Sequence, residues 1–255
     1  MRIAILTVAG ISSRFNQGVE EDRKVLKCLY TEGGSEDTLL YHLLKKCSYA
    51  DRIIIVGGYK YDDLRAFCET ELSGEFPQIE LVYNEHYADL SSGYSLYLGV
   101  NEAVKNSPEE ILFVEGDLDI DEPSFENVVR SEGTVLTYTY EPIYADKAVV
   151  LYKNGDGRYK YAFNSSHGLL SIDEPFSCML NSGQAWKFSD MDALTKANRK
   201  FCESDRTGTN LVIIQSYIDS LDNDKITLVP LKRWTNCNTR ADYAIIKGYW
   251  EEDAL

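Results

Sequence analysis

Residues 3–14 read Ile-Ala-Ile-Leu-Thr-Val-Ala-Gly-Ile-Ser-Ser-Arg. The apolar run 3–8 predicts a buried strand, which breaks into small residues followed by a fixed cation. Glycine and small residues let backbone N–H groups approach an anion closely, and the arginine supplies positive charge. The break after the strand therefore predicts a phosphate-binding loop. Its residues are Ala9, Gly10, Ile11, Ser12, Ser13 and Arg14.

A second group of cations follows the loop, because residues 23–29 read Arg-Lys-Val-Leu-Lys-Cys-Leu. The spacing of the loop matches neither the P-loop pattern G-x-x-x-x-G-K-[ST] nor the dinucleotide pattern G-x-G-x-x-G. A plain turn between a strand and a helix is the alternative interpretation. The lysines downstream favour phosphate binding over that alternative.

Length and charge bound the class of protein. The chain has 255 residues and a formal net charge of −15, which argues against nucleic acid and anionic membranes as partners but not against a nucleotide in a locally basic cleft. No apolar run approaches the roughly 20 residues of a membrane span. The first residues also lack the apolar core of a signal peptide. A cytoplasmic location is expected.

The six cysteines form no C-x-x-C pair, which predicts reduced thiols in or near the core. Cys28 lies beside the predicted loop, so we expect thiol reagents to reach it.

Apolar runs without alternation predict a mostly parallel sheet covered by helices on both faces, a Rossmann-like α/β fold. The predicted strands are 3–8, 52–56, 79–83, 111–114 and 226–231. The predicted helices are 38–47, 62–72, 93–104, 190–203, 210–221 and 240–251. A Tyr-, Val- and Thr-rich stretch, 134–183, is predicted to be an antiparallel excursion, with a hairpin of strands 148–152 and 159–163. We expect one domain over 1–255.

Acidic residues follow the strand 111–114, where the sequence reads Glu-Gly-Asp-Leu-Asp over 115–119. Ligands of open α/β sheets bind at the carboxyl ends of the strands, and Mg²⁺ takes one or two carboxylates plus phosphate oxygens. Asp117 is therefore a candidate metal ligand. In an extended chain Asp119 would point the same way as Asp117. An acidic, solvated turn is the alternative, above all for Asp119.

A polar loop connects the strand 79–83 to the helix 93–104. Loops of this size at the carboxyl end of a strand often bind a ligand, so we interpret it as a base-recognition loop. Its serines could instead cap the helix. They are Ser91, Ser92 and Ser95.

These motifs together resemble the nucleotidylyltransferases, the family of the sugar-phosphate nucleotidylyltransferases and phosphocholine cytidylyltransferases. Residues 8–14 resemble the signature L-x-A-G-x-G/S-S-R, and Lys27 matches the lysine of P-K-x-L, with Leu26 in place of proline. The segment 54–59 resembles V-x-G-Y, and the segment 84–96 resembles N-x-x-Y…S-L. The resemblance implies nucleotide contacts at Gly58 in the first segment and at Asn84 and Ser95 in the second. The Gly-Asp pair 116–117 lies at the family's metal position, and residues 234–243 resemble W-x-E-I-D-T-x-x-D. All of these motifs occur in the family's order and span nearly the whole chain.

The resemblance implies a three-layer nucleotidyltransferase fold and a Mg²⁺-dependent transfer of a nucleotidyl group to a phosphate- or phosphonate-bearing acceptor, with release of pyrophosphate. It implies that Arg14 and Lys27 neutralise the phosphates, and that Asp117 and Asn238 hold the metal. Asn238 stands where the family has an aspartate, so it offers a carbonyl oxygen without charge. CTP is the preferred donor, because the loop 84–96 and the short chain are closer to the cytidylyltransferases.

Two other functions stay open at this point. A glycosyltransferase of related fold would use Asp117 and Asp119 as a D-x-D metal motif and would not need the phosphate loop. A non-catalytic nucleotide-binding protein is the second alternative, motivated by Asn238. The acceptor and the oligomeric state, which includes a homodimer, are left open by the sequence. Six tyrosines of the middle stretch could surround a quaternary ammonium group or simply pack. They are Tyr138, Tyr140, Tyr144, Tyr152, Tyr159 and Tyr161.

Overall fold

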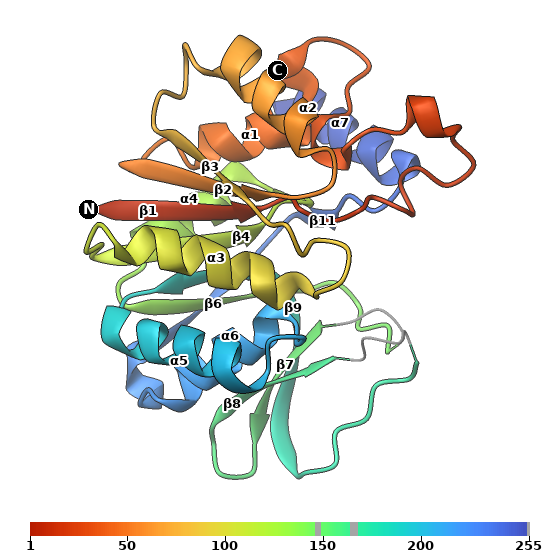
Figure 1. Cartoon of the computed structure of the whole chain (residues 1–255). Helices are drawn as coiled ribbons and strands as arrows, with labels where there is room; N and C mark the ends of the chain where they lie inside the picture. Colours follow the sequence, from red (N-terminus) through yellow and green to blue (C-terminus); the bar gives the residue numbers. More distant parts are fainter. Residues whose placement is uncertain (146–148, 164–167, 254–255) are drawn as a thin grey trace.

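The computed structural model describes residues 1–145, 149–163 and 168–253. Its central sheet has the strand order β10-β6-β9-β4-β1-β2-β3 (Figure 1). The strands of this path are β1 (Arg2–Thr7), β2 (Arg52–Gly57), β3 (Ile79–Tyr83), β4 (Glu110–Glu115), β6 (Thr134–Thr139), β9 (Phe176–Phe188) and β10 (Ile226–Leu231).

Most neighbours in this sheet run parallel. β1 pairs in parallel with β2 and β4, β2 with β3, and β6 with β10. β9 is the exception, since it runs antiparallel to both β4 and β6. The mostly parallel α/β sheet expected from the apolar runs is confirmed.

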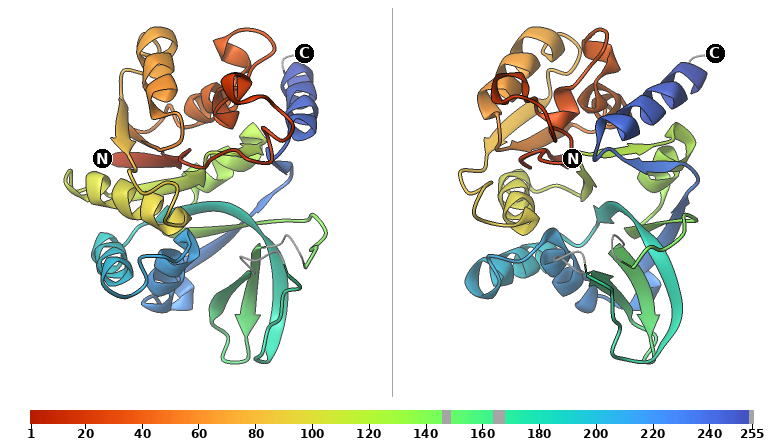
Figure 2. Two further views of the ribbon diagram at one scale, coloured as in Figure 1. Left: turned by 45° about the vertical axis from the view of Figure 1, so that its right-hand side comes forward. Right: turned by 90° about the vertical axis from the view of Figure 1, so that its right-hand side faces the viewer.

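Helices cover both faces of the sheet and give three layers (Figures 1 and 2). One face packs on α1 (Leu39–Lys46), α2 (Tyr61–Phe67), α4 (Glu122–Arg130) and α7 (Arg240–Asp253). The other face packs on α3 (Ser92–Val104), α5 (Met191–Ser204) and α6 (Asn210–Asp219). Because side chains alternate along a strand, Ile3 and Ile5 of β1 join the α3 core while Ala4 and Leu6 join the α1 core.

Short turns complete the helical structure. They are Glu21–Arg23, Lys27–Leu29, Ser35–Asp37 and Asn223–Lys225, with a wider helical turn, Cys68–Leu72, extending α2. Thr38 caps α1 by accepting a hydrogen bond from the backbone N–H of Tyr41, as its position before the apolar face of the helix suggests.

The antiparallel excursion is narrower than expected. It consists of β7 (Val149–Asn154), β8 (Tyr159–Phe163) and the first half of β9, whereas β6 belongs to the central sheet. The prediction placed β6 in the excursion because its Thr- and Tyr-containing sequence differs from the aliphatic runs of the other strands. The predicted start of the hairpin at residue 148 lies outside the described residues.

A small second sheet was not predicted at all. In it, β5 (Leu118–Ile120) pairs antiparallel with β11 (Trp234–Asn236), more than a hundred residues away in the sequence. Strands of three residues carry too little periodicity to be recognised locally. This ladder brings the closing segment 234–243 next to the turn that holds Asp117.

Candidate active site

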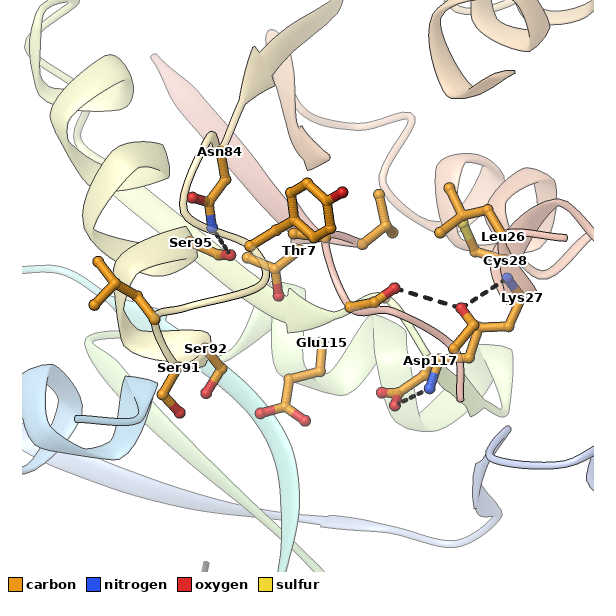
Figure 3. A pocket seen from close by; sticks show the side chains of 17 residues that line it. Thr7, Leu26, Lys27, Cys28, Asn84, Ser91, Ser92, Ser95, Glu115 and Asp117 are labelled. Carbon is orange, nitrogen blue, oxygen red and sulfur yellow. Dashed lines mark hydrogen bonds and ion pairs between the residues drawn. The ribbon is translucent and has the colours of Figure 1, made fainter. Parts of the chain in front are cut away.

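A cleft of about 250 Å³ opens at the carboxyl ends of β1 and β4. From β1 the chain continues to β2 and β3 on one side, whereas β4 lies on the other side of β1, so the strand order reverses there. Ligands of open α/β sheets bind at such a reversal. Four segments meet around the cleft (Figure 3): the loop after β1, the Lys27 segment, the loop that leads into α3, and the end of β4 with the turn after it.

An ion pair closes one end of the cleft. The Lys27 ammonium lies 2.6 Å from Oδ2 of Asp117, and the two side chains are 19% and 20% exposed. The other carboxylate oxygen of Asp117, Oδ1, is buried without a hydrogen-bond partner. The backbone oxygen of Asp117 accepts a hydrogen bond from the Cys237 N–H at 2.7 Å, which ties this turn to the closing segment. One buried oxygen of Asp117 thus remains for a donor or a cation.

The phosphate loop is joined to the lysine segment. Ser12 has a φ of +59°, an uncommon conformation for a residue with a side chain. Its hydroxyl oxygen accepts a hydrogen bond from the Lys27 backbone N–H at 3.2 Å. The Asn16 side chain bonds both the N–H and the C=O of Val25. These contacts hold Lys27 over the loop although the two are fifteen residues apart in the sequence.

The predicted loop residues do not all face the cleft. Ala9, Gly10 and Ser12 line it. Ile11, Ser13 and Arg14 are exposed and do not belong to its lining.

The base-recognition loop is organised by hydrogen bonds of Asn84. Its Nδ2 donates to Ser95 Oγ at 2.9 Å, and its Oδ1 accepts from the His86 N–H at 2.9 Å. Ser91 occupies the N-cap position of α3 but its side chain makes no cap hydrogen bond, so the capping interpretation does not hold for it. All four predicted residues of this segment line the cleft: Asn84, Ser91, Ser92 and Ser95.

Gly58 lies behind the wall of the cleft. A Cβ there would come within 2.4 Å of Tyr87 Cβ and 3.0 Å of Ala9 Cβ. The absent side chain therefore lets the base-recognition loop pack against the phosphate loop. The structure places Gly58 as a spacer between these loops, outside the lining where we expected a nucleotide contact.

Glu115 is a residue of the cleft to which the sequence assigned no role. It ends β4 opposite Thr7 of β1, and its Oε1 accepts a hydrogen bond from Asn210 Nδ2 at 2.6 Å. Burial, and secondarily the negative charge of Asp117, raise the pKa of Glu115 to about 7. Asn210 begins α6, 95 residues away, so no local pattern could have linked the two.

The second predicted metal ligand has another partner. Asn238 Oδ1 accepts a hydrogen bond from Arg14 Nη2 at 2.7 Å. The amide oxygen that a metal ion would need is thus already bound by Arg14, so in this arrangement Asn238 does not fit a metal ligand. Among the described residues no group of three or more His, Cys, Asp or Glu side chains could hold a metal. Asp117, with its orphaned buried oxygen, does fit a ligand for Mg²⁺, which also takes water and phosphate oxygens.

The expectation that Asp119 points the same way as Asp117 is wrong. Asp119 is fully buried away from the cleft, where Oδ1 accepts hydrogen bonds from Lys46 Nζ at 3.1 Å and Trp250 Nε1 at 2.9 Å. Asp117 lies in a turn and Asp119 in β5, so the two do not share an extended strand. A D-x-D pair of metal ligands is therefore not formed.

The cysteine next to Lys27 is also different from expectation. Cys28 lines the cleft with only 1% of its surface exposed, and burial raises the pKa of its thiol well above the usual range. We therefore expect thiol reagents to react poorly with it. All six cysteines are free thiols.

The tyrosines of the middle stretch have separate structural contacts. Tyr161 accepts a hydrogen bond from Trp186 Nε1, and Tyr152 donates one to Glu174. The rings of Tyr138 and Tyr140 contact each other edge to face. These contacts favour packing over a single aromatic cage.

The fold is that of the nucleotidylyltransferases. A protein from Bacillus anthracis assigned as a glucose-1-phosphate thymidylyltransferase aligns with a TM-score of 0.67 and 14% identity, over 98% of this chain and 95% of that one. The inositol-1-phosphate CTP transferase from T. maritima aligns with a TM-score of 0.66 and 16% identity, over 96% of this chain and 95% of that one. The CTP:phosphocholine cytidylyltransferase from Streptococcus pneumoniae aligns with a TM-score of 0.63 and 15% identity, over 98% of this chain and all of that one.

Within this fold class, the chain belongs to the family described as a domain of unknown function, DUF6564, whose model matches residues 23–250. No curated protein sequence matches the chain. No helix in the described part of the chain is long and apolar enough to cross a membrane.

Proposed function

We propose that the protein is a nucleotidylyltransferase that transfers a nucleotidyl group from a nucleoside triphosphate to a small acceptor bearing a phosphate or phosphonate. The observation that carries the proposal is the Lys27–Asp117 ion pair at the mouth of the phosphate loop, at the strand-order reversal of the sheet. This arrangement puts a cation and a carboxylate beside the loop that would bind the triphosphate.

The reaction asks for positioning and charge neutralisation more than for proton transfer. An oxygen of the acceptor attacks the α-phosphorus, the bond to the β-phosphate oxygen breaks, and pyrophosphate leaves. The acceptor oxygen is already an anion at neutral pH, so no general base is needed. The protein must hold two anions together, which makes fixed cations and backbone N–H groups the main catalytic devices.

The residues of the cleft divide these tasks. Backbone N–H groups at Gly10 and Ser12 would bind the phosphates, and the Lys27 ammonium would exchange its carboxylate partner for phosphate oxygens. Asp117 would hold Mg²⁺, which would supply charge neutralisation at the α-phosphate. With Asn238 paired to Arg14, water and substrate oxygens would complete the metal shell.

CTP is the proposed donor. Two of the similar structures reported above are CTP enzymes by name, and Asn84 and Ser95 bring an amide and a hydroxyl group to the lining of the cleft. The glycosyltransferase alternative loses its main support, because Asp119 is buried and bound to Lys46. A nucleotide-binding protein without transfer activity remains the second candidate, favoured by the Arg14–Asn238 contact.

The test is a matrix of Mg²⁺, the four ribonucleoside triphosphates, and a panel of phosphomonoesters and phosphonates, with pyrophosphate as the readout. We expect CTP with one acceptor class to release pyrophosphate. Release with another nucleotide would correct the donor alone. Tight nucleotide binding without pyrophosphate for any acceptor would support the second candidate, and absence of both binding and turnover would overturn the proposal.

A further inference from the structure

Glu115 places a carboxylate inside a cleft that otherwise suits a polyanion. It lines the same cleft as Lys27 and Asp117, but no cation within the described residues forms an ion pair with it. A carboxylate near bound phosphates is unfavourable unless it contacts a part of the ligand that donates hydrogen bonds. The question is which part of a nucleotide would lie against it.

The position of Glu115 along the cleft indicates which part of a nucleotide would lie against it. Figure 3 shows its carboxylate between Ser91 and Ser92 on one side and Asp117 on the other. The serines belong to the base-recognition loop, and Asp117 faces the α-phosphate in the proposed function. In a nucleotide the ribose joins the base to the α-phosphate, so the sugar must pass the point that Glu115 occupies.

The carboxylate is held in place by the start of α6. Asn210 Nδ2 donates to Glu115 Oε1 at 2.6 Å, and the backbone N–H of Asn210 donates to Ser92 Oγ at 3.3 Å. Asn210 itself is 3% exposed. A carboxylate has about four acceptor positions, of which this hydrogen bond uses one. Glu115 is therefore oriented and still able to accept hydrogen bonds from two neighbouring hydroxyls.

We propose that Glu115, oriented by Asn210, accepts hydrogen bonds from the ribose hydroxyls of the bound nucleotide and makes the site selective for ribonucleotides over 2′-deoxyribonucleotides. This inference rests on the proposed function, because it takes the base and the phosphates to lie as described there. Glu115 contacts the substrate, and Asn210 is a positioning residue. A hydroxyl of the acceptor offers the same chemistry, but Glu115 lies on the base-loop side of Asp117.

The experiment compares four ribonucleoside triphosphates with their 2′-deoxy counterparts, by kcat/KM for pyrophosphate release and by calorimetric Kd. The variants are Glu115→Leu, Glu115→Gln and Asn210→Ala, and the control is Glu69→Gln, an exposed carboxylate in the helical turn Cys68–Leu72 that extends α2. For the wild type we expect a preference of about 10- to 100-fold for the ribonucleotide, the range of a hydrogen bond to a charged group. The control is expected to keep this preference.

In Glu115→Leu the preference is expected to fall to within about threefold of unity, because only the ribonucleotide loses a partner for a 2′-hydroxyl, whereas the partner of the 3′-hydroxyl is lost to both nucleotides. In Glu115→Gln the preference should lie between those of the wild type and Glu115→Leu, because an amide oxygen still accepts a hydrogen bond. Asn210→Ala should lower the preference, because a less well oriented Glu115 lowers kcat/KM more for the ribonucleotide, which has two hydroxyls to bind, than for the deoxynucleotide, which has one. Circular dichroism checks that each variant folds.

Three results would overturn the inference. An unchanged preference in Glu115→Leu shows that Glu115 does not read the sugar. A change confined to the KM of the acceptor assigns Glu115 to the acceptor instead, and a change confined to CTP against UTP assigns it to the base. In each of these cases the proposed function stands, because nucleotides are still bound or used. If no triphosphate binds to the wild type, both proposals fail.

Discussion

At the scale of single residues, the cleft is built around one charge pair. Lys27 and Asp117 come from segments 90 residues apart and meet at 2.6 Å. Each neutralises the other while no ligand is bound, which keeps both charges partly buried at little cost. A triphosphate and a divalent cation together can replace both partners, so each of the two charges is compensated before and after binding.

Lys27 is therefore the residue whose removal should cost the most activity. We expect Lys27→Ala to lower the rate of pyrophosphate release by about 10²- to 10³-fold, because one preorganised charge is lost from the developing negative charge. The matched control is Lys24→Ala, a lysine of the same segment that pairs with Glu21 outside the cleft. Wild-type turnover in Lys27→Ala, with a folded protein by circular dichroism, contradicts the assignment.

At the scale of elements, the site depends on how closely loops from neighbouring strands approach. The loop after β1, the end of β2 and the loop after β3 meet at Gly58, where Ala9 and Tyr87 leave no room for a side chain. The same interlocking is seen at Ser12, whose hydroxyl joins the phosphate loop to the Lys27 segment. These contacts set how far apart the loops around the cleft lie.

A methyl group at Gly58 should disturb both stability and nucleotide binding. For Gly58→Ala we expect a loss of about 1–3 kcal/mol in the free energy of unfolding, because the new Cβ overlaps Tyr87 and Ala9, together with a raised KM for the nucleotide. Urea unfolding and initial rates measure the two effects. The control is Gly248→Ala on α7, where no atom lies within 4 Å of the new Cβ, and where we expect equal or greater stability. Equal behaviour of the two variants would refute the spacer role.

At the scale of the whole molecule, α7 locks the closing segment onto the sheet. Trp250 of α7 stacks on His42 of α1 with ring centroids 3.7 Å apart and donates a hydrogen bond to the buried Asp119. Asp119 also binds Lys46, and Arg233 lies 3.7 Å from its other oxygen. This cluster fixes β5 and β11, and through them the turn that carries Asp117.

The His42 contact predicts a pH dependence of stability. Burial, with a smaller effect of the nearby Lys46 charge, lowers the pKa of His42 from 6.5 to about 4. The folded state therefore binds fewer protons than the unfolded state between these values, so stability falls as pH falls through 6.5 toward 4. Allowing for partial contact of the ring with solvent, we expect about 1 kcal/mol at pH 5.

The measurement is urea unfolding at pH 7 and pH 5 of the wild type and of His42→Phe, which keeps an aromatic ring against Trp250 but cannot titrate. On going from pH 7 to pH 5, the wild type should lose more free energy of unfolding than the variant. Glu115, whose pKa is raised to about 7, also titrates in this range, but it is common to both proteins and cancels in the comparison. An equal loss in both proteins shows that His42 is not responsible.

Much of the frame of this protein could be predicted from local patterns. The strands β3 and β10 begin and end where the apolar runs predict, and α1, α3 and α7 differ by one or two residues at their ends. A strand with a continuous apolar run must be buried on both faces. The parallel, helix-covered sheet therefore follows from the sequence pattern of the strands. Small residues after β1 likewise predict a loop at this edge of the sheet, and Ala9, Gly10 and Ser12 of that loop line the cleft.

What escaped prediction depends on distant partners. β6 resembles the excursion in composition but lies in the central sheet, because its neighbours β9 and β10 come from much later in the chain. Asp119 is near Asp117 in sequence yet turns to Lys46 and Trp250. A buried charged side chain turns toward the partner that best offsets the cost of removing it from water. A local sequence pattern does not show which residue that partner is.

By itself, the sequence determined the layers of this protein, the order of its main elements along the chain, and the place of the loop, the lysine and the first aspartate, because these follow from local apolar periodicity and backbone freedom. Only the tertiary structure decided which side chains face one another: Lys27 with Asp117, Asn210 with Glu115, and Arg14 with Asn238. Such contacts join residues far apart in the chain, and they are selected by the free energy of burying charge, which exists only once the sheet and its helices have assembled.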